Sequence, residues 1–334
     1  MTVLNVAFVG SQEFAKSIAK LNDTRDIESY VFKMVQDDEV KILSLLRPLR
    51  HPEKLRPLLS ILNVARAGVV EISKVDASLG EILVAFGCSG IENGHIIIHP
   101  ADGEWVDPEQ VKMIQQQAGL SSWTLHENPL DEHQMRTLLF AELDKLADHS
   151  EQRLVIPVDQ YFNVKGVGLV AIGYVQSGTV NKHDRLLALP TAESGVTRSL
   201  QVMDDDVDTA RAGDRVGVAM RDLREAALER GSILVHPDED GNYVESMSRH
   251  MKSRLELVRA PFQQKEIAVG DVIHAAVDLQ FVVGRVESID GNELEVTWEQ
   301  PLFLRPVSQP RVLINQLDAK MRLLGFSTNL IPLE

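Results

Sequence analysis

A stretch near the start of the chain, residues 3–17, constrains the fold more than any other. An apolar run ends at Gly10, and Lys16 and Ser17 follow six residues later. This spacing is typical of a strand, a phosphate-binding loop and a helix, with the frame G-x-x-x-x-G-K-[ST], except that Ala15 replaces the second glycine. We expect the helix to begin after Ser17. An ordinary strand-to-helix turn fits the same spacing.

Two residues of this loop oppose phosphate binding. A phosphate loop points successive backbone N–H groups at the anion, and the Cβ of Ala15 resists that close approach. The carboxylate of Glu13 would repel a phosphate by about 1–4 kcal/mol at about 4 Å, depending on the local dielectric. We therefore interpret Gly10, Lys16 and Ser17 as the remnant of a nucleotide-binding loop.

Composition and charge limit the class of protein. The 334 residues suffice for two or three domains, and no apolar run is long enough to span a bilayer. No signal peptide is visible, and the single cysteine, Cys88, excludes an intrachain disulfide, so we expect a cytoplasmic protein without a membrane partner. A formal net charge of -15 argues against DNA binding and requires any nucleic acid to bind at a local basic patch.

Residues 1–150 alternate between strand and helix patterns. Such alternation predicts an α/β domain with a mostly parallel sheet covered by helices. We expect strands at 4–9, 41–46, 67–72, 95–98 and 122–125, and helices after Ser17, from Pro52, from Leu79, after Asp107 and after Asp131.

After residue 150 the pattern changes to short strands separated by glycine-containing turns. Residues 151–240 predict an all-β barrel, and the polar segment 237–243 is expected to be a linker. Residues 250–334 predict a second β-barrel, whose clearest signal is the hairpin 282–298 with its turn at Asp290-Gly291.

From Val155 onward, four segments carry a family resemblance: IPVDQYFNVKGVGLVAIGYVQSGTV, RSLQV, AGDRVGVAMR and ERGSIL. Their order and spacing resemble the second domain of the EF-Tu family of translational GTPases. Gln201 and the run 212–217 resemble the SelB branch more than EF-Tu itself. The ending RVLINQLDAKMRLLGFST resembles, less specifically, the third domain of the family. The resemblance spans the full length and implies a P-loop-GTPase-like α/β domain followed by two β-barrels.

The resemblance allows the GTPase motifs to be checked. Where the family has D-x-P-G-H, this chain keeps only His51, the position that the family uses to orient the attacking water. Arg47 replaces the metal-linked aspartate, and Arg50 replaces the glycine that senses the γ-phosphate. Of the base-reading N-K-x-D motif only Asp102 remains, and the segment for the magnesium-binding threonine is too short.

Phosphoryl transfer needs a positioned metal, a phosphate cradle and an oriented water, and these supports are missing together. The resemblance therefore implies a pseudo-GTPase without nucleotide or metal, in which His51 is vestigial and is an ordinary surface or capping histidine. Arg47 and Arg50 either bind an anion or are solvated charges. The alternative is a divergent GTPase that uses GTP, magnesium and Lys16, Ser17, His51 and Asp102.

The second domain of the family holds the aminoacylated 3′ end of tRNA. Phe162 would stack on a base or line an amino-acid pocket, although Val167 stands where the family often has an arginine. A barrel-core Phe162 and a simple turn at 214–217 remain the alternative. The positions that match the pocket are Asp159, Phe162, Gln201, Asp214 and Arg215.

The third domain of the family contacts the tRNA backbone. The matching basic residues are Lys252, Arg254, Arg259, Lys320 and Arg322. Carboxylates interleave with them, so a solvated surface is an equal alternative. The acidic run 204–206 would repel RNA, and we expect it to lie away from it.

The sequence thus predicts a SelB-like paralogue that binds aminoacyl-tRNA or tRNA, or the ribosome, without hydrolysing GTP. Members of this kind are linked to unusual amino acids such as selenocysteine or pyrrolysine, and the sequence does not choose among them. The alternatives are the divergent GTPase and a protein-interaction module in which the α/β domain docks a partner.

Overall fold

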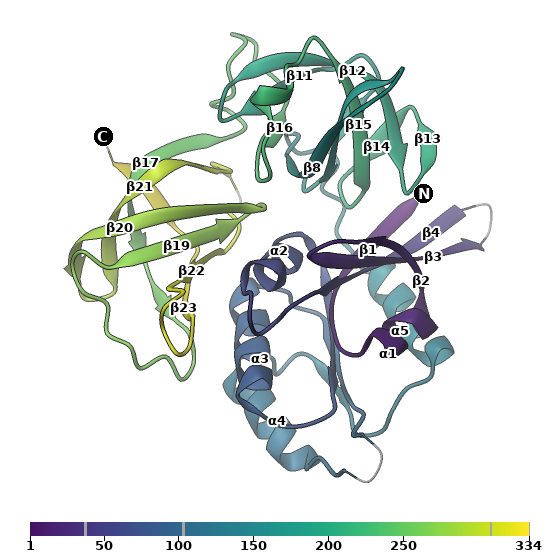
Figure 1. The fold of residues 1–334 in the computed structure, drawn as a ribbon, viewed down its shortest axis with the longest axis vertical. Helices are drawn as coiled ribbons and strands as arrows, with labels where there is room; N and C mark the ends of the chain where they lie inside the picture. The colour runs from purple at the N-terminus through teal and green to yellow at the C-terminus, as the bar shows by residue number, and fades with distance from the viewer. Residues whose placement is uncertain (37–38, 102–103, 308, 334) are drawn as a thin grey trace. The chain divides into compact units, whose positions relative to one another are not determined.

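The computed structural model describes residues 1–36, 39–101, 104–307 and 309–333 (Figure 1). Asp102 lies outside these residues. By the density of their internal contacts the residues form two compact units, of which the first contains residues 1–146, 258–266 and 313–326 and the second contains the rest. Among the described helices, none combines the length and apolar character needed to cross a membrane.

The first unit is built on a seven-stranded sheet with the order β2-β3-β4-β1-β5-β6-β7. Strands β4, β1, β5, β6 and β7 run parallel, as the sequence predicts, while β2, β3 and β4 form an antiparallel meander at one side. The hairpin of β2 and β3 was not predicted. The strands are β1 Thr2–Val9, β2 Lys20–Thr24, β3 Ile27–Gln36, β4 Glu39–Pro48, β5 Ala67–Ile72, β6 Gly94–Ile98 and β7 Thr124–His126.

Five helices accompany this sheet, and three of them begin elsewhere than predicted. The first helix begins at Gln12, because the Ser11 hydroxyl accepts a hydrogen bond from the Phe14 backbone N–H and caps it there. The second begins at Arg56 rather than at Pro52. The third begins at Ala77 rather than at Leu79, because Asp76 caps it there. The helices are α1 Gln12–Ile18, α2 Arg56–Val64, α3 Ala77–Ser89, α4 Pro108–Gln117 and α5 Glu132–Leu143.

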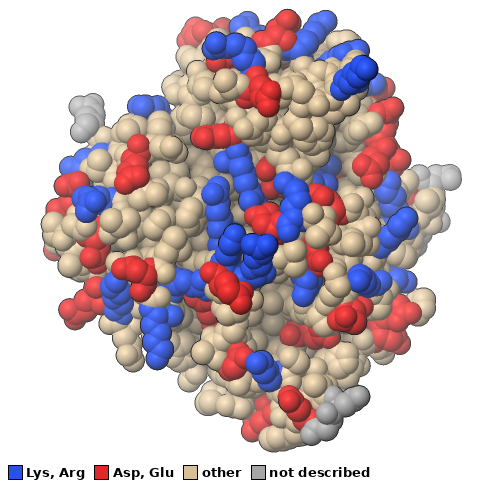
Figure 2. Space-filling view, viewed as in Figure 1, with Lys and Arg blue, Asp and Glu red and all other residues tan. Residues whose placement is uncertain are grey.

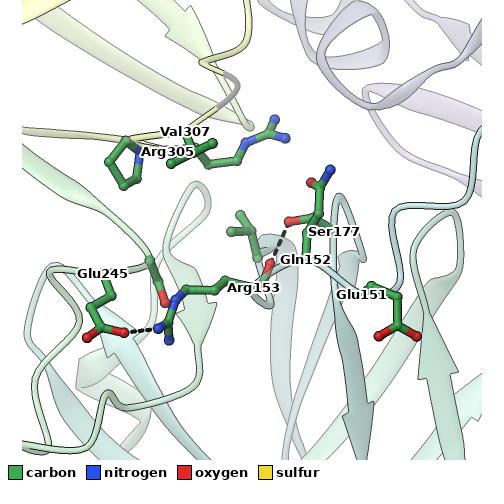
Figure 3. Close-up of a pocket in the computed structure, with 10 residues that line it drawn as sticks. Glu151, Gln152, Arg153, Ser177, Glu245, Arg305 and Val307 are labelled. Atoms are coloured by element: carbon green, nitrogen blue, oxygen red, sulfur yellow. Dashed lines mark hydrogen bonds and ion pairs between the residues drawn. The ribbon is translucent and has the colours of Figure 1, made fainter.

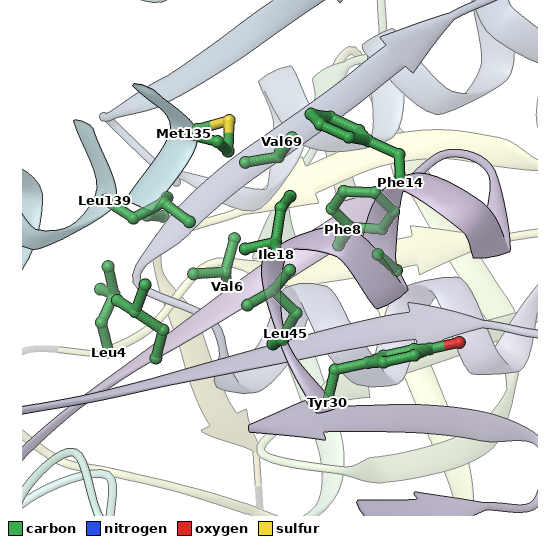
Figure 4. Close-up of a cluster of buried hydrophobic side chains, with 14 of the residues drawn as sticks. Leu4, Val6, Phe8, Phe14, Ile18, Tyr30, Leu45, Val69, Met135 and Leu139 are labelled. Carbon is green, nitrogen blue, oxygen red and sulfur yellow. The ribbon is translucent and has the colours of Figure 1, made fainter. Parts of the chain in front are cut away.

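The core of the α/β domain lies between one face of the sheet and helices α1 and α5 (Figure 4). Val6 on β1 and Leu139 on α5 are fully buried there. Burying such a side chain contributes about 1.5–3 kcal/mol. Asp131 fixes the start of α5 through a capping box with Gln134, as its position before the apolar stripe predicts. This packing fixes the ends of β1 and β5, where a phosphate loop would lie.

The second unit contains a closed barrel of six strands. Its sheet has the order β11-β16-β8-β9-β15-β12-β13, and an additional pairing of β11 with β12 closes the ring. A short sheet of β10 and β14 accompanies it. The bounds are β8 Ile156–Val164, β9 Gly168–Tyr174, β10 Thr179–Asn181, β11 Arg185–Leu189, β12 Glu193–Val202, β13 Asp205–Val207, β14 Thr209–Arg211, β15 Arg215–Arg221 and β16 Ile233–Val235.

The C-terminal strands form an eight-stranded sheet with the order β18-β23-β22-β19-β20-β21-β17-β24. The predicted hairpin is formed by β20 and β21, with Gly291 at its turn in a left-handed conformation (φ 59°). The bounds are β17 Ser248–Glu256, β18 Val258–Arg259, β19 Val272–Val277, β20 Gln280–Asp290, β21 Glu293–Leu304, β22 Val312–Asn315, β23 Leu323–Ser327 and β24 Leu330–Leu333.

Candidate functional site

The loop after β1 does not form a phosphate cradle. Because α1 starts at Gln12, Lys16 and Ser17 lie in its last turn rather than at its beginning. The Lys16 ammonium donates a hydrogen bond to Gln12 Oε1 at 2.9 Å, and the Ser17 hydroxyl donates to the Phe14 carbonyl at 2.9 Å. Both side chains are thus engaged by their own helix, and the expectation that the helix follows Ser17 is wrong.

A carboxylate of the protein itself meets the loop after β1. The Ser11 backbone N–H donates to Glu71 Oε2 at 2.6 Å, and His99 Nδ1 lies 2.7 Å from Glu71 Oε1. A Cβ added at Gly10 would lie 2.8 Å from Glu71 Oε2, so glycine is required there. Sequence reasoning missed Glu71. Its one available signal was a lone charge in the otherwise apolar strand Ala67–Ile72.

A second carboxylate, Glu28, holds the other side of the same loop. Arg47 donates to Glu28 Oε2 at 2.9 Å and, through Nε, to the Gly10 carbonyl at 2.8 Å. The Tyr30 hydroxyl and the Gln12 amide also donate to Glu28, at 2.6 and 2.8 Å. Burial opposes ionisation of Glu28, but these hydrogen bonds outweigh it and lower its pKa. Arg47 is therefore neither a solvated charge nor a vacant anion receptor.

His51 takes part in an ion-pair cluster and is not a surface residue. Its side chain is 5% exposed, and its Nε2 lies 3.1 Å from Glu81 Oε2. Arg322 donates through Nε to Glu81 Oε1 at 3.0 Å, and a second guanidinium nitrogen also contacts this carboxylate. Burial opposes the charge on Glu81, but the His51 and Arg322 hydrogen bonds prevail and lower its pKa to about 2. Arg50, which replaces the family's glycine, keeps a left-handed backbone (φ 60°) and is exposed.

The described residues around this loop differ from a phosphate loop in their charge and in the partners of their donors. Among the residues that the structure describes, no group of three or more histidine, cysteine, aspartate or glutamate side chains could hold a metal ion. The carboxylates of Glu28 and Glu71 place negative charge at this loop, at the position where a phosphate loop would bind its anion. Such carboxylates and a phosphate repel each other.

The barrel of the second unit carries a cavity of about 580 Å³ on the outer face of its strands, because most of the lining residues on β9 and β15 alternate with the fully buried ones. Its walls include Phe162 on β8, Gln201 on β12 and Arg215 on β15, three of the five residues that the sequence selected for a tRNA pocket. Phe162 is 40% exposed, so it is not part of the barrel core. The Arg215 guanidinium lies 6.0 Å from the centre of the Tyr174 ring. Apolar walls with a few polar groups are typical of ligand pockets.

The other two predicted pocket residues have structural contacts. Asp159 is 7% exposed and forms an ion pair with Arg230 at 3.3 Å. Asp214 is 4% exposed and accepts the Arg211 backbone N–H at 2.8 Å, which closes the turn before β15. Neither residue is among those that line the cavity, so the structure does not bring them together with Phe162, Gln201 and Arg215.

The acidic run 204–206 does not lie away from the cavity. Asp204 and Asp206 are part of its lining, and Asp206 accepts a hydrogen bond from the Gln201 amide at 2.9 Å. Lys182 also lines the cavity, but its ammonium pairs with Asp208 at 2.6 Å. The cavity therefore presents apolar walls with charges of both signs, and it is not a basic groove.

The five basic residues predicted to contact the tRNA backbone are mostly engaged within the protein. Lys252 and Arg254 both pair with Glu295, at 3.3 and 2.9 Å. Arg259 donates to the Lys265 carbonyl at 2.9 Å, and Arg322 belongs to the Glu81 cluster. Lys320 is exposed. Acidic and basic side chains are interspersed over the visible face (Figure 2), and three of these five cations already have a carboxylate partner.

A smaller cavity in the second unit, of about 320 Å³, is lined in part by charged side chains (Figure 3). Arg153 contacts Glu245 and lies 3.6 Å from Asp238, while Arg305 pairs with Asp278 at 3.0 Å. Its guanidinium groups therefore have carboxylate partners within the protein, and this cavity has no evident charge preference for an anion.

The sequence matches known proteins over different shares of its length. The family model for elongation factor Tu domain 2 matches residues 168–235. An uncharacterized protein of Methanocaldococcus jannaschii is 30% identical over 326 residues, which cover 97% of this chain and 99% of that protein. The selenocysteine-specific elongation factor of the same organism is 32% identical over 150 residues, which cover 44% of this chain and 31% of that protein.

The fold is also that of a solved elongation factor. The crystal structure of translation elongation factor SelB from Methanococcus maripaludis, in its apo form, superposes with a TM-score of 0.79 at 20% identity. The superposition covers 100% of this chain and 81% of that one. With the barrel cavity, the domain-2 match and the full-length relative, these findings show that the chain belongs to the EF-Tu family of translation elongation factors, as a SelB-like paralogue.

Proposed function

We propose that this protein binds the aminoacylated 3′ end of tRNA in the cavity of its second-domain barrel. The observation that carries the proposal is that Phe162, Gln201 and Arg215 line one cavity. An exposed aromatic ring offers a stacking surface for the terminal base. Arg215 and Gln201 add hydrogen-bond donors for the ester and phosphate oxygens. Ribosome binding and a cytoplasmic location accompany this proposal, with neither a membrane nor DNA as partner.

We infer further that the protein works without GTP hydrolysis and needs no nucleotide or metal cofactor. The inference rests on the Ser11 N–H and Arg47, which hydrogen-bond to Glu71 and Glu28 of the protein itself. A divergent GTPase would have to displace Glu71 from the Ser11 N–H and Glu28 from Arg47, and each hydrogen bond to a charged group contributes about 1.5–3 kcal/mol.

The tRNA proposal is tested by equilibrium binding to charged and uncharged tRNA. We expect tighter binding of the charged form, and Phe162→Ala should weaken it about tenfold through the loss of one stacked base. Trp105→Ala, which removes an exposed aromatic ring of the α/β domain, is the matched control and should change nothing. A different result would favour a protein-interaction module: both tRNA forms bind equally, the binding does not depend on salt, and Phe162→Ala does not change it.

The nucleotide inference is tested by titration with a fluorescent, non-hydrolysable GTP analogue, with and without magnesium. We expect no binding up to about millimolar concentration, because the loop's donors are already engaged. Micromolar binding that depends on magnesium would overturn the inference and make His51 the first residue to replace.

A further inference from the structure

We propose that Arg198 is a positioning residue for the barrel cavity, an inference that rests on the proposed function. Arg198 occupies a β-bulge of β12. Thr197 pairs with Met220 and Ser199 pairs with Ala219, so that Arg198 has no opposite residue on β15. A bulge bends its strand and turns a side chain in a new direction, and bulges are common beside functional sites.

The Arg198 side chain contacts the turn that connects β8 to β9. Its Nη1 donates to the Gly166 carbonyl at 3.1 Å and to the Val167 carbonyl at 2.7 Å. Gly166 and Gly168 both have left-handed backbones, with φ of 84° and 106°. Two glycines make a turn conformationally free, and hydrogen bonds to two consecutive carbonyls restrict that freedom.

This turn forms part of the cavity wall. Val164 and Val167 line the cavity from the turn side, and Ser199, directly after the bulge, lines it from β12. Arg198 itself does not line the cavity. Its hydrogen bonds connect β12 to the turn between β8 and β9, and residues from both segments line the cavity. The cation that contacts this turn therefore comes from the neighbouring strand β12.

The geometry gives Arg198 two effects that Val167 cannot supply. It holds the backbone of the turn so that the Val167 side chain forms part of the cavity wall, and its own guanidinium stays outside the lining. Both hydrogen bonds come from Nη1, whose two N–H groups are fixed in the guanidinium plane, whereas the donors of a lysine ammonium rotate freely on a flexible stem. The role therefore depends on the guanidinium group and not on positive charge alone.

The test uses Arg198→Gln and Arg198→Lys, with Arg185→Gln as the matched control. Arg185 is an exposed arginine of the same barrel whose guanidinium contacts Ser194 at 3.3 Å, outside the cavity. Amide hydrogen exchange at residues 165–168 reports on the turn, and the affinity for charged tRNA reports on the cavity. Thermal unfolding is recorded for each variant, so that a general loss of stability is recognised.

We expect Arg198→Gln to speed exchange in the turn about tenfold and to weaken charged-tRNA binding by a similar factor, with an unchanged unfolding temperature. Arg198→Lys should recover only part of both effects, and Arg185→Gln should show neither. Unchanged exchange at 165–168 in Arg198→Gln overturns the positioning role, whatever the tRNA result. Faster exchange with no tRNA binding by the wild-type protein overturns the proposed function and leaves the effect of Arg198 on the turn intact.

Discussion

At the scale of single residues, Glu81 is a carboxylate that two partners hold in its ionised form. Its carboxylate lies between His51 and Arg322, with an exposed fraction of 11%. Its folded-state pKa of about 2 is below the ordinary value of 4.5. The ionised group therefore contributes stability that is complete above about pH 4.5 and is lost as the pH falls towards 2. The shift corresponds to about 3 kcal/mol.

Replacing Glu81 with glutamine should lower the free energy of unfolding by about 2–3 kcal/mol at pH 7, because Arg322 then stays largely buried without a carboxylate. Between pH 4.5 and 2 the wild-type protein loses this advantage, so the two unfolding curves should converge. Urea unfolding across this pH range measures the difference. Glu53→Gln, at an exposed glutamate, is the control. A difference that is as large at pH 2 as at pH 7 would show that the cluster does not depend on ionised Glu81.

At the scale of elements, two glycines of the α/β domain have opposite requirements. Gly80 lies inside α3, and a Cβ built there meets nothing within 4 Å. Gly94 begins β6, and a Cβ built there would lie 2.5 Å from the Trp123 ring. Helix α3 has room for a side chain at Gly80, whereas β6 needs a glycine at position 94 because the Trp123 indole packs directly against it.

We therefore expect Gly80→Ala to stabilise the protein by about 0.5–1 kcal/mol, the difference in helix propensity. Gly94→Ala should destabilise it by about 1–3 kcal/mol, the usual effect of overpacking a core. Chemical unfolding of both variants, monitored by Trp fluorescence, measures the two changes. The packing argument fails if Gly94→Ala is as stable as the wild type.

The sequence predicts those elements whose signals are local. Strand 67–72 and the Asp107 and Asp131 caps were read correctly, because apolar runs and capping residues act over a few positions. The start of α1 was misplaced because the family frame outweighed Ser11, an ordinary capping residue. The hairpin of β2 and β3 was missed because β2 is polar and nearly all exposed.

The candidate site was less predictable for a physical reason. Phe162, Gln201 and Arg215 were found through family turn chemistry, and the cavity brings them together. The contact of Glu71 with Ser11 joins residues 60 positions apart and depends on which parallel strands are neighbours. No periodicity or spacing carries that information. The Arg198 bulge likewise exists only in the pairing of two strands.

At the scale of the whole molecule, the net charge of -15 limits how RNA can bind. At long range the net negative charge of the protein repels the phosphates of RNA, so the favourable contacts must be few and local. We expect the logarithm of the tRNA affinity to fall with the logarithm of salt concentration with a slope no steeper than about −3, which corresponds to about three or four phosphates. Filter binding between low and physiological salt measures this slope. A slope of about −6 or steeper would require an extended basic surface and would contradict the cavity-centred proposal.

Glu71 is part of the polypeptide, so, unlike a bound nucleotide, it cannot dissociate, be exchanged or be depleted. On the inference that Glu71 takes the place of a phosphate, the loop would not respond to the cellular ratio of GTP to GDP, and an exchange factor would have no nucleotide to replace. On the proposed function, occupancy would follow only the concentration of charged tRNA and the competition from other elongation factors. Delivery of that tRNA would then need a timing signal from the recipient, such as a competing surface that takes the 3′ end out of the cavity.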